Sequence, residues 1–240
     1  MANLKDSLYL QQQRLPEIPP GFPQGHPVEG DWQLPILAPV LLEQDPLDAI
    51  AFDDRKRVAD SRRSVIHFYR DDSKFMGVIL KPKAWVHQFS TFGFVITPDL
   101  SLGDDMPEWV VAHRVFYSRA VGVVWQKCGI VVIPHLRWRH TGQISQVVKG
   151  ISVSSTVAVS NYGFRRNKTE RQIFAEGLAI VLELLKPQQI ILYGSIKPEF
   201  EHLLSAVPKV LVFEKRIVSH GLPVGAEKGV NASPSCDTLF

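Results

Sequence analysis

Short, almost wholly apolar segments recur along this chain and alternate with longer segments of helical periodicity. We predict strands at 64–69, 94–98, 129–134, 155–160, 189–195 and 209–214, separated by helices at 81–92, 106–127, 169–185 and 198–207. Strands that are apolar on both faces are typical of a parallel sheet covered on both sides, and their alternation with helices indicates βαβ units. We therefore expect an α/β fold with a mostly parallel sheet. It is either an open sheet or an incomplete TIM-like barrel, because about six strands are too few for a full eight-stranded barrel.

The predicted α/β domain, residues 61–217, lies between two segments of different composition. Residues 1–60 contain eight of the 17 prolines. They predict an extended Pro-rich N-terminal arm, because proline lacks an amide donor and disfavours a helical residue before it. The arm also carries apolar side chains and a "LPILAPVLL" run, so we expect it to pack along the domain or onto a partner. Residues 218–240 are small, polar and turn-rich, which predicts a flexible C-terminal tail.

Charge is distributed unevenly along the chain. Residues 1–60 hold five Lys/Arg and ten Asp/Glu, whereas residues 61–240 hold 22 and 14. The folded part is therefore basic and the arm acidic, a weak indication of an anionic or nucleic-acid-associated partner. No signal peptide or 18-residue apolar span is evident, so we expect a cytoplasmic protein. Cys128 and Cys236 lie far apart and no Cys/His pair has zinc spacing, so we expect no metal and no cofactor.

Both long predicted helices have recognisable start signals. Asp105-Met-Pro-Glu108 fits a capping box, in which the first carboxylate accepts from the first-turn amides and the second reaches back. Thr169-Glu-Arg-Gln172 follows the same pattern. In the acidic cluster after the strand at 94–98, Asp105 and Glu108 are therefore interpreted as helix-capping residues. Asp99 is not explained by capping of this helix and stays a candidate site residue.

Polar and aromatic residues collect just beyond the predicted strands. Ligands of parallel α/β sheets bind at the carboxyl ends of the strands, so we expect these residues to share one edge. The candidates for catalysis are Asp99, His135, Arg137 and Asn161, and the candidates for ligand or partner binding are Trp138, Arg139, Arg165, Arg166, Tyr193 and Ser195. The residues from His135 to Arg171 include seven Lys/Arg and one acidic residue, so a phosphate is a plausible ligand.

Each candidate also has a structural interpretation. Asp99 follows Pro98 and could cap a turn, and Arg137 could be its buried partner. Asp71 and Asp72 suit a solvated loop or a helix cap. Ser195 follows a glycine in "LYGS", but no matched base identifies it as a nucleophile. The chain lacks a dinucleotide fingerprint, a Walker A sequence and a G-x-S-x-G elbow.

Five motifs in order carry a family resemblance over roughly residues 62–216. They are "VITPDLSLGDDMP", "VVIPHLRW", "STVAVSNYG", "ERQIFAEGLAIVLELLKPQQIILYGS" and "VLVFEKR". With these motifs the chain resembles a family of phage and mobile-element proteins that is classed as a domain of unknown function. The resemblance implies an α/β fold and a phage origin, and it supplies no activity. The chain departs from its relatives at Arg139-His140-Thr141, where they tend to have an amide or acid.

The size and the acidic Pro-rich arm also resemble the recombination directionality factors of large serine integrases in temperate actinophages. This resemblance implies a phage accessory protein that docks on the integrase at attachment-site DNA and promotes excision, without chemistry of its own. It would act in the bacterial host cell, and direct DNA contact would be weak.

Two classes of function therefore stay open. The first is control of recombination direction through integrase binding. The alternative is a phage enzyme acting on a nucleotide, nucleic acid or other phosphorylated ligand, with Asp99 as the acid/base group and His135 and Arg137 as orienting or anion-binding groups.

Overall fold

The computed structural model describes residues 15, 17–58, 60–103, 105–164 and 167–214. Its main strands form two four-stranded sheets in which every pairing is parallel. The first sheet contains β3 (Asp48–Ala51), β4 (Ser64–His67), β5 (Phe94–Ile96) and β6 (Val132–Ile133), and the second contains β7 (His135–Leu136), β8 (Thr156–Ser160), β9 (Gln189–Tyr193) and β10 (Lys209–Phe213). The predicted parallel α/β fold is confirmed.

The two sheets are joined through one continuous extended stretch of chain, which contains β6 and β7. Only Pro134 separates β6 from β7, so one stretch of chain pairs first with β5 and then with β8. Proline has no amide to donate to a ladder, which explains why regular pairing is interrupted there. Spatial order follows chain order from β3 to β10, as in a singly wound barrel.

The sheet is strongly curved. The ring of His67 on β4 lies 4.1 Å from the ring of Tyr193 on β9, although three strand positions separate β4 from β9. In a flat sheet, strands this far apart would be about 19 Å from each other, because neighbouring strands are about 4.8 Å apart. The interior is filled by one apolar cluster from both sheets: Leu42, Val65, Ile96, Ile133, Ala158 and Ile191. The described β3 and β10 do not pair with each other, so the structure is an open, curved sheet with the form of an incomplete barrel.

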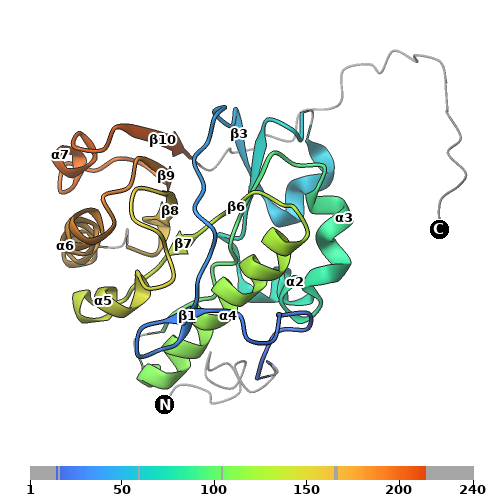
Figure 1. Ribbon diagram of the computed structural model, residues 1–240. Helices are drawn as coiled ribbons and strands as arrows, with labels where there is room; N and C mark the ends of the chain where they lie inside the picture. The colour runs from blue at the N-terminus through green and yellow to red at the C-terminus, as the bar shows by residue number, and fades with distance from the viewer. Residues whose placement is uncertain (1–14, 16, 59, 104, 165–166, 215–240) are drawn as a thin grey trace, which may run out of the picture.

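Helices cover the outside of this sheet (Figure 1). The two long helices are α4 (Glu108–Lys127) and α6 (Lys168–Leu185). The shorter helices are α2 (Met76–Leu80), α3 (Val86–Phe89), α5 (Ile144–Val147) and α7 (Glu201–Leu204), and the 3-10 segments are η2 (Phe52–Arg57), η3 (Asp72–Lys74), η4 (Pro82–Trp85), η5 (Thr141–Gln143) and η6 (Tyr162–Phe164). Two buried clusters lie between helices and sheet, one centred on Trp138 and Phe174 and one on Trp125 and Phe68. None of the described helices is both long and apolar enough to cross a membrane.

The predicted helix starts were wrong in detail. Helix α4 begins at Glu108 with Pro107 as its N-cap residue and no side-chain cap, and Asp105 is exposed. Helix α6 is capped two residues before the predicted box, where the Asn167 side chain accepts from the amide of Glu170 at 2.8 Å. An Asn side chain is as good an N-cap as Ser or Asp, so Thr169 is left inside the first turn.

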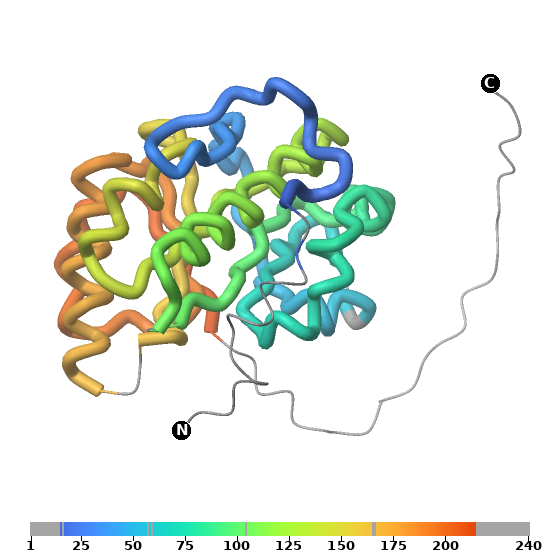
Figure 2. The backbone as a smooth tube through the Cα atoms, turned by 90° about the horizontal axis from the view of Figure 1, so that it is seen from below, coloured from blue at the N-terminus to red at the C-terminus, as the bar shows by residue number. Residues whose placement is uncertain are grey.

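The described part of the expected arm packs along the domain. Within it, β1 (Val28–Glu29) pairs with β2 (Leu34–Pro35), and β2 lies against α4 (Figure 2). Leu42, a member of the interior cluster, then exchanges two hydrogen bonds with the side chain of Gln189, at 2.7 and 2.9 Å. The chain continues into β3, which pairs with β4 as the first strand of the sheet. The expected C-terminal tail, 218–240, lies outside the described residues.

Candidate functional site

The carboxyl ends of the strands place polar and aromatic side chains above the apolar interior. Side chains on a strand alternate between its faces, so residues two apart point the same way. His67, His135, Ser160 and Tyr193 follow the interior residues Val65, Ile133, Ala158 and Ile191 by two positions. Because the strands are parallel and the sheet is curved, these four side chains gather at one mouth of the incomplete barrel.

A cavity of about 330 Å³ opens at this mouth. It is lined by Tyr69, Arg70, Asp71, Asp99, Ser101, His135, Arg137, Ser160, Tyr162, Gly163 and Phe164. Three of the four predicted catalytic candidates, Asp99, His135 and Arg137, are therefore brought together. We refer to this space as the mouth cavity.

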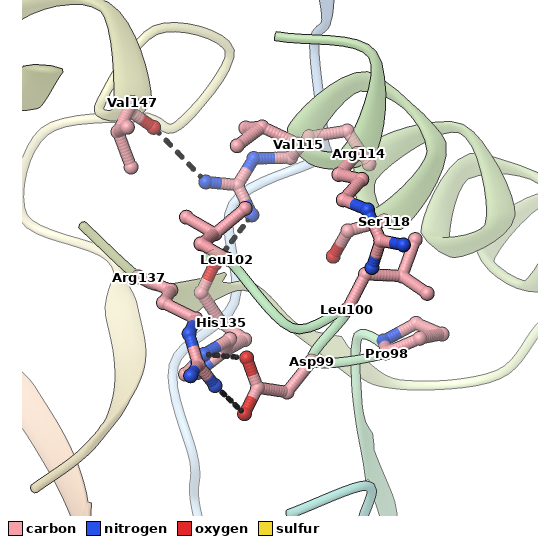
Figure 3. A pocket seen from close by; sticks show the side chains of 11 residues that line it. Pro98, Asp99, Leu100, Leu102, Arg114, Val115, Ser118, His135, Arg137 and Val147 are labelled. Carbon is pink, nitrogen blue, oxygen red and sulfur yellow. Dashed lines mark hydrogen bonds and ion pairs between the residues drawn. The ribbon is translucent and has the colours of Figure 1, made fainter. Parts of the chain in front are cut away.

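Asp99 is held by both of its neighbours in this group. Its Oδ1 lies 2.9 Å from Nε2 of His135, and its Oδ2 accepts from Nη1 of Arg137 at 2.7 Å (Figure 3). Burial alone would raise the pKa of Asp99, but the charge of Arg137 and the contact with His135 outweigh burial and hold this pKa well below its usual value. Arg137 is thus the partner of Asp99, as one of the two sequence interpretations proposed.

His135 links Asp99 to Tyr69. Its Nδ1 lies 3.2 Å from the Tyr69 hydroxyl, so a chain of contacts runs from Asp99 through the imidazole to a phenol that lines the mouth cavity. Burial, and secondly the charge of Asp99, raise the pKa of Tyr69 well above its usual value. Tyr69 is therefore a neutral hydroxyl at physiological pH, able to donate and to accept.

Two buried arginines of α4, Arg114 and Arg119, support the site, and neither was among the predicted site residues. Arg119 is fully buried and donates to the backbone carbonyls of His135 at 2.7 Å and Val147 at 3.1 Å. Burial lowers the pKa of Arg119 to about 9, so the side chain remains charged at neutral pH. Arg114 forms an ion pair with Asp72 at 2.7 Å. The signal in the sequence was a pair of arginines within the mostly apolar stretch of this helix from Val110 to Trp125.

The adjacent carboxylates Asp71 and Asp72 have different roles. Asp71 caps η3 by accepting from the amide of Ser73 at 2.9 Å, which is the expected helix-cap role. Asp72 is buried, and besides Arg114 it accepts from the amide of Ser101 at 3.1 Å. A second cavity, of about 20 Å³, is lined in part by Arg114, Arg119 and Asp99 (Figure 3).

Aromatic rings complete the mouth. Tyr193 stacks on Tyr69 at 4.8 Å and on Tyr162 at 5.0 Å, and His67 lies against Tyr69 at 5.0 Å. Burial, followed by the charge of Arg70, lowers the pKa of His67 to about 3, so this imidazole is neutral. Burial also raises the pKa of Tyr193 to about 12. Tyr193, a predicted binding residue, therefore acts as the wall behind Tyr69 and Tyr162.

Trp138, another predicted binding residue, is placed in the core instead of at the mouth. Its side chain is 1% exposed and stacks on Phe174 of α6 at 5.5 Å. Its indole also fills the space above Gly177, where an added Cβ would lie 2.2 Å from Nε1. The physical reason is alternation: His135 and Arg137 face the mouth, so Leu136 and Trp138 face the helices.

Three further candidates, Asn161, Arg139 and Ser195, do not line the mouth cavity. Asn161 is buried and donates to the Ser195 carbonyl at 2.6 Å, which ties the loop after β8 to the loop after β9. This contact requires Gly194, which has φ +133°, because a Cβ there would lie 1.8 Å from the Asn161 oxygen. Arg139 lies over the Phe164 ring at 5.8 Å. Arg165 and Arg166 lie outside the described residues.

Metal ligation finds no support in the part of the chain that the structure describes. No group of three or more His, Cys, Asp or Glu side chains within these ranges could hold a metal ion. The polar groups at the mouth are phenols, hydroxyls and guanidinium groups, together with one imidazole and two carboxylates.

Comparison with known proteins places the chain among phage proteins. Residues 26–213 match the model of the family described as Domain of unknown function (DUF4417). The chain is 29% identical over 171 residues to the Gene 1 protein of Mycobacterium phage D29, a match covering 71% of this chain and 63% of that protein. It is 30% identical over 166 residues to the Gene 1 protein of Mycobacterium phage L5, covering 69% of this chain and 72% of that protein. No solved structure matches significantly.

Proposed function

We propose, from the premise that the chain belongs to the DUF4417 family of domains of unknown function, that it is a phage accessory protein which binds a large serine integrase and controls recombination direction, promoting excision. The similarity to mycobacteriophage proteins supports a role in a phage, as does the resemblance of the chain to recombination directionality factors.

The observation that carries this proposal is the mutual engagement of the polar groups at the strand ends. Both oxygens of Asp99 are occupied by His135 and Arg137, and Asp72 is occupied by Arg114 and Ser101. Such pairing shapes a rigid scaffold at the strand ends. A scaffold of this kind suits a protein that acts through binding.

Direction control requires no chemistry from the accessory protein. It requires only that the protein bind one integrase–DNA arrangement more tightly than the other, so that the equilibrium shifts by the difference in binding free energy. The excess of acidic residues in the arm, ten against five basic ones in residues 1–60, suits a basic DNA-binding partner.

Reconstitution tests the proposal. The purified full chain is mixed with the integrase of its own phage and with attachment-site DNA in the excision configuration, and recombination products are counted with and without the protein. We expect excision only when the protein is present, together with a complex on size-exclusion chromatography. Absence of both would refute integrase control. A gel shift with DNA alone, repeated across salt concentrations, separates direct DNA binding from binding through the integrase.

The chain from Asp99 through His135 to Tyr69 favours a second candidate, an enzyme acting on a phosphorylated ligand. In this candidate Asp99 would orient His135, because its low pKa makes it a poor proton donor at neutral pH. The Tyr69 hydroxyl, 3.2 Å from His135, would be the group that meets the ligand, with Arg137 on its anionic part.

The substitution Tyr69→Phe discriminates between the two candidates. It removes one hydroxyl and keeps the ring in its stack on Tyr193. Integrase control predicts that the variant promotes excision as well as the wild type does. An enzymatic role predicts loss of biological function by about 100-fold or more, because proton transfer contributes about that much. Circular dichroism confirms that the variant remains folded.

A further inference from the structure

The mouth cavity has the size and the shape of a site for one small ligand. Pockets for small molecules usually measure about 300–1,000 Å³ and lie at the carboxyl ends of barrel strands. The cavity of about 330 Å³ lies at that end and is lined by side chains of separate loops and strands. Its volume therefore admits a ligand no larger than a mononucleotide.

The aromatic part of the wall selects a planar group. Tyr69, Tyr162 and Phe164 line the cavity, and Tyr193 stacks on both tyrosines from behind at 4.8 and 5.0 Å. A ring held by such packing loses little freedom when a ligand binds. Nucleobases stack on aromatic side chains such as tyrosine, and all four bases can do so because each has a π-face.

The charged part of the wall offers two guanidinium groups, Arg70 and Arg137, beside two carboxylates, Asp71 and Asp99. Of the two carboxylates that line the cavity, Asp71 accepts hydrogen bonds from Ser73, and Asp99 accepts from Arg137 and lies 2.9 Å from His135. Arg137 donates from Nη1 to Asp99, while its Nε is buried and has no partner among the described residues. A guanidinium carries five N–H donors, so Arg137 keeps donors for a further acceptor.

The loop after β8 lies beside this guanidinium. A Cβ added at Gly163 would lie 3.4 Å from Nη2 of Arg137, so the glycine brings the loop backbone close to the charge. Arg70 adds a second guanidinium to the lining, held by Asp53 and Asp54 at 3.1 Å each. Planar guanidinium groups recognise phosphate oxygens in pairs.

We infer that the mouth cavity binds a nucleoside monophosphate or a close chemical relative, with the base beside Tyr162 and the phosphate at Arg137. This inference concerns binding alone and goes beyond integrase control. It also gives the enzyme candidate a ligand class, since binding is required whether or not turnover follows.

Calorimetric titration of the full chain with AMP, GMP, CMP and UMP tests this inference. Adenosine, the other parent nucleosides and inorganic phosphate serve as part-ligands. We expect at least one monophosphate to bind at least tenfold more tightly than its own nucleoside and tenfold more tightly than phosphate. If no monophosphate binds, or if phosphate alone binds equally well, the inference is overturned.

Three variants locate the binding. Tyr162→Leu removes a ring from the wall, Arg137→Lys keeps a charge for Asp99 but removes the planar fork, and Arg70→Gln removes the second guanidinium. We expect each to weaken monophosphate binding at least tenfold. Arg171→Gln is the matched control, because Arg171 is a half-buried arginine paired to Glu199 outside the cavity, and it should change binding less than twofold.

The outcomes remain separate from those of the recombination assay. Unchanged monophosphate binding in folded Tyr162→Leu and Arg137→Lys overturns the inference and leaves integrase control in place. Conversely, a failed recombination assay does not affect the titration, which uses the chain without integrase or DNA.

Discussion

The buried side chain of His67 makes the stability of the folded protein depend on pH. It is fully buried among aromatic rings, and burial together with Arg70 lowers its pKa to about 3. An unfolded histidine titrates near pH 6.5, so between about pH 6.5 and 3 the unfolded chain binds a proton that the folded chain does not. The contribution of His67 to the free energy of unfolding is therefore fully present above about pH 6.5. As the pH falls below this value, the contribution decreases by up to about 1.4 kcal/mol per pH unit.

The substitution His67→Phe should remove this dependence. Phenylalanine keeps a ring beside Tyr193 but leaves the Tyr69 amide without the Nδ1 acceptor at 3.2 Å, at a cost of about 1–3 kcal/mol at every pH. We expect the free energy of unfolding in urea to fall less steeply from pH 6.5 to 4.5 in the variant than in the wild type. His87→Phe, at an exposed histidine, is the control and should keep the wild-type slope. Parallel curves for wild type and His67→Phe would contradict the prediction.

At the residue scale, one of two ion pairs near the site was predictable from the sequence and the other was not. The Asp99–Arg137 pair could be anticipated, because both residues follow strands of one parallel sheet. The Asp72–Arg114 pair could not, because its arginine comes from a helix whose orientation depends on the packing of the whole domain. Trp138 could have been assigned to the core from alternation alone, since it is two residues beyond the buried Leu136.

Among the elements, the side chain of Gln189 helps to hold the arm to the amino ends of the strands. Gln189 at the start of β9 donates to the Leu42 carbonyl at 2.9 Å and accepts from the Leu42 amide at 2.7 Å. Its oxygen also accepts from the Thr156 hydroxyl at 2.6 Å. The side-chain amide therefore takes the place of a neighbouring strand for this part of the arm.

Replacing Gln189 should loosen this end of the molecule. Gln189→Leu leaves two backbone groups of Leu42 and one hydroxyl buried without partners, so we expect a loss of about 2–4 kcal/mol in the free energy of unfolding. Hydrogen exchange of the Leu42 amide should accelerate more than that of amides in β8. Gln172→Leu, which removes an exposed side-chain hydrogen bond to Glu176, is the control and should cost less than about 0.5 kcal/mol. Equal losses in the two variants would contradict this assignment.

The strands were largely predictable from sequence, whereas their curvature and ends were not. Short apolar runs such as "VAV" in β8 and "IILY" in β9 indicate buried strands directly. β3 was missed because Asp48–Ala51 is short, includes a charged residue and follows Pro46. Sheet curvature arises from how the interior layer packs across several strands, which no single segment records.

At the scale of the whole molecule, the two ends of the barrel carry different surfaces. The carboxyl end holds the mouth cavity, whereas the amino end is covered by the arm through Leu42 and Gln189. Two leucines of this arm segment, Leu41 and Leu47, are 57% and 58% exposed beside the buried Leu42. Exposed leucines on an acidic arm suit docking of a protein partner, with the mouth left open to a ligand.

The double substitution Leu41→Ser/Leu47→Ser tests this division. It removes two exposed apolar side chains, so stability should change by less than about 1 kcal/mol, since surface substitutions are usually within about 0.5 kcal/mol each. We expect integrase binding, measured by surface plasmon resonance, to weaken at least tenfold while monophosphate binding is unchanged. The control is Leu184→Ser/Ile196→Ser, which alters side chains 44% and 41% exposed elsewhere. If the control loses integrase binding and the arm variant keeps it, the docking surface includes α6 or the loop after β9, and the arm serves only to close the barrel.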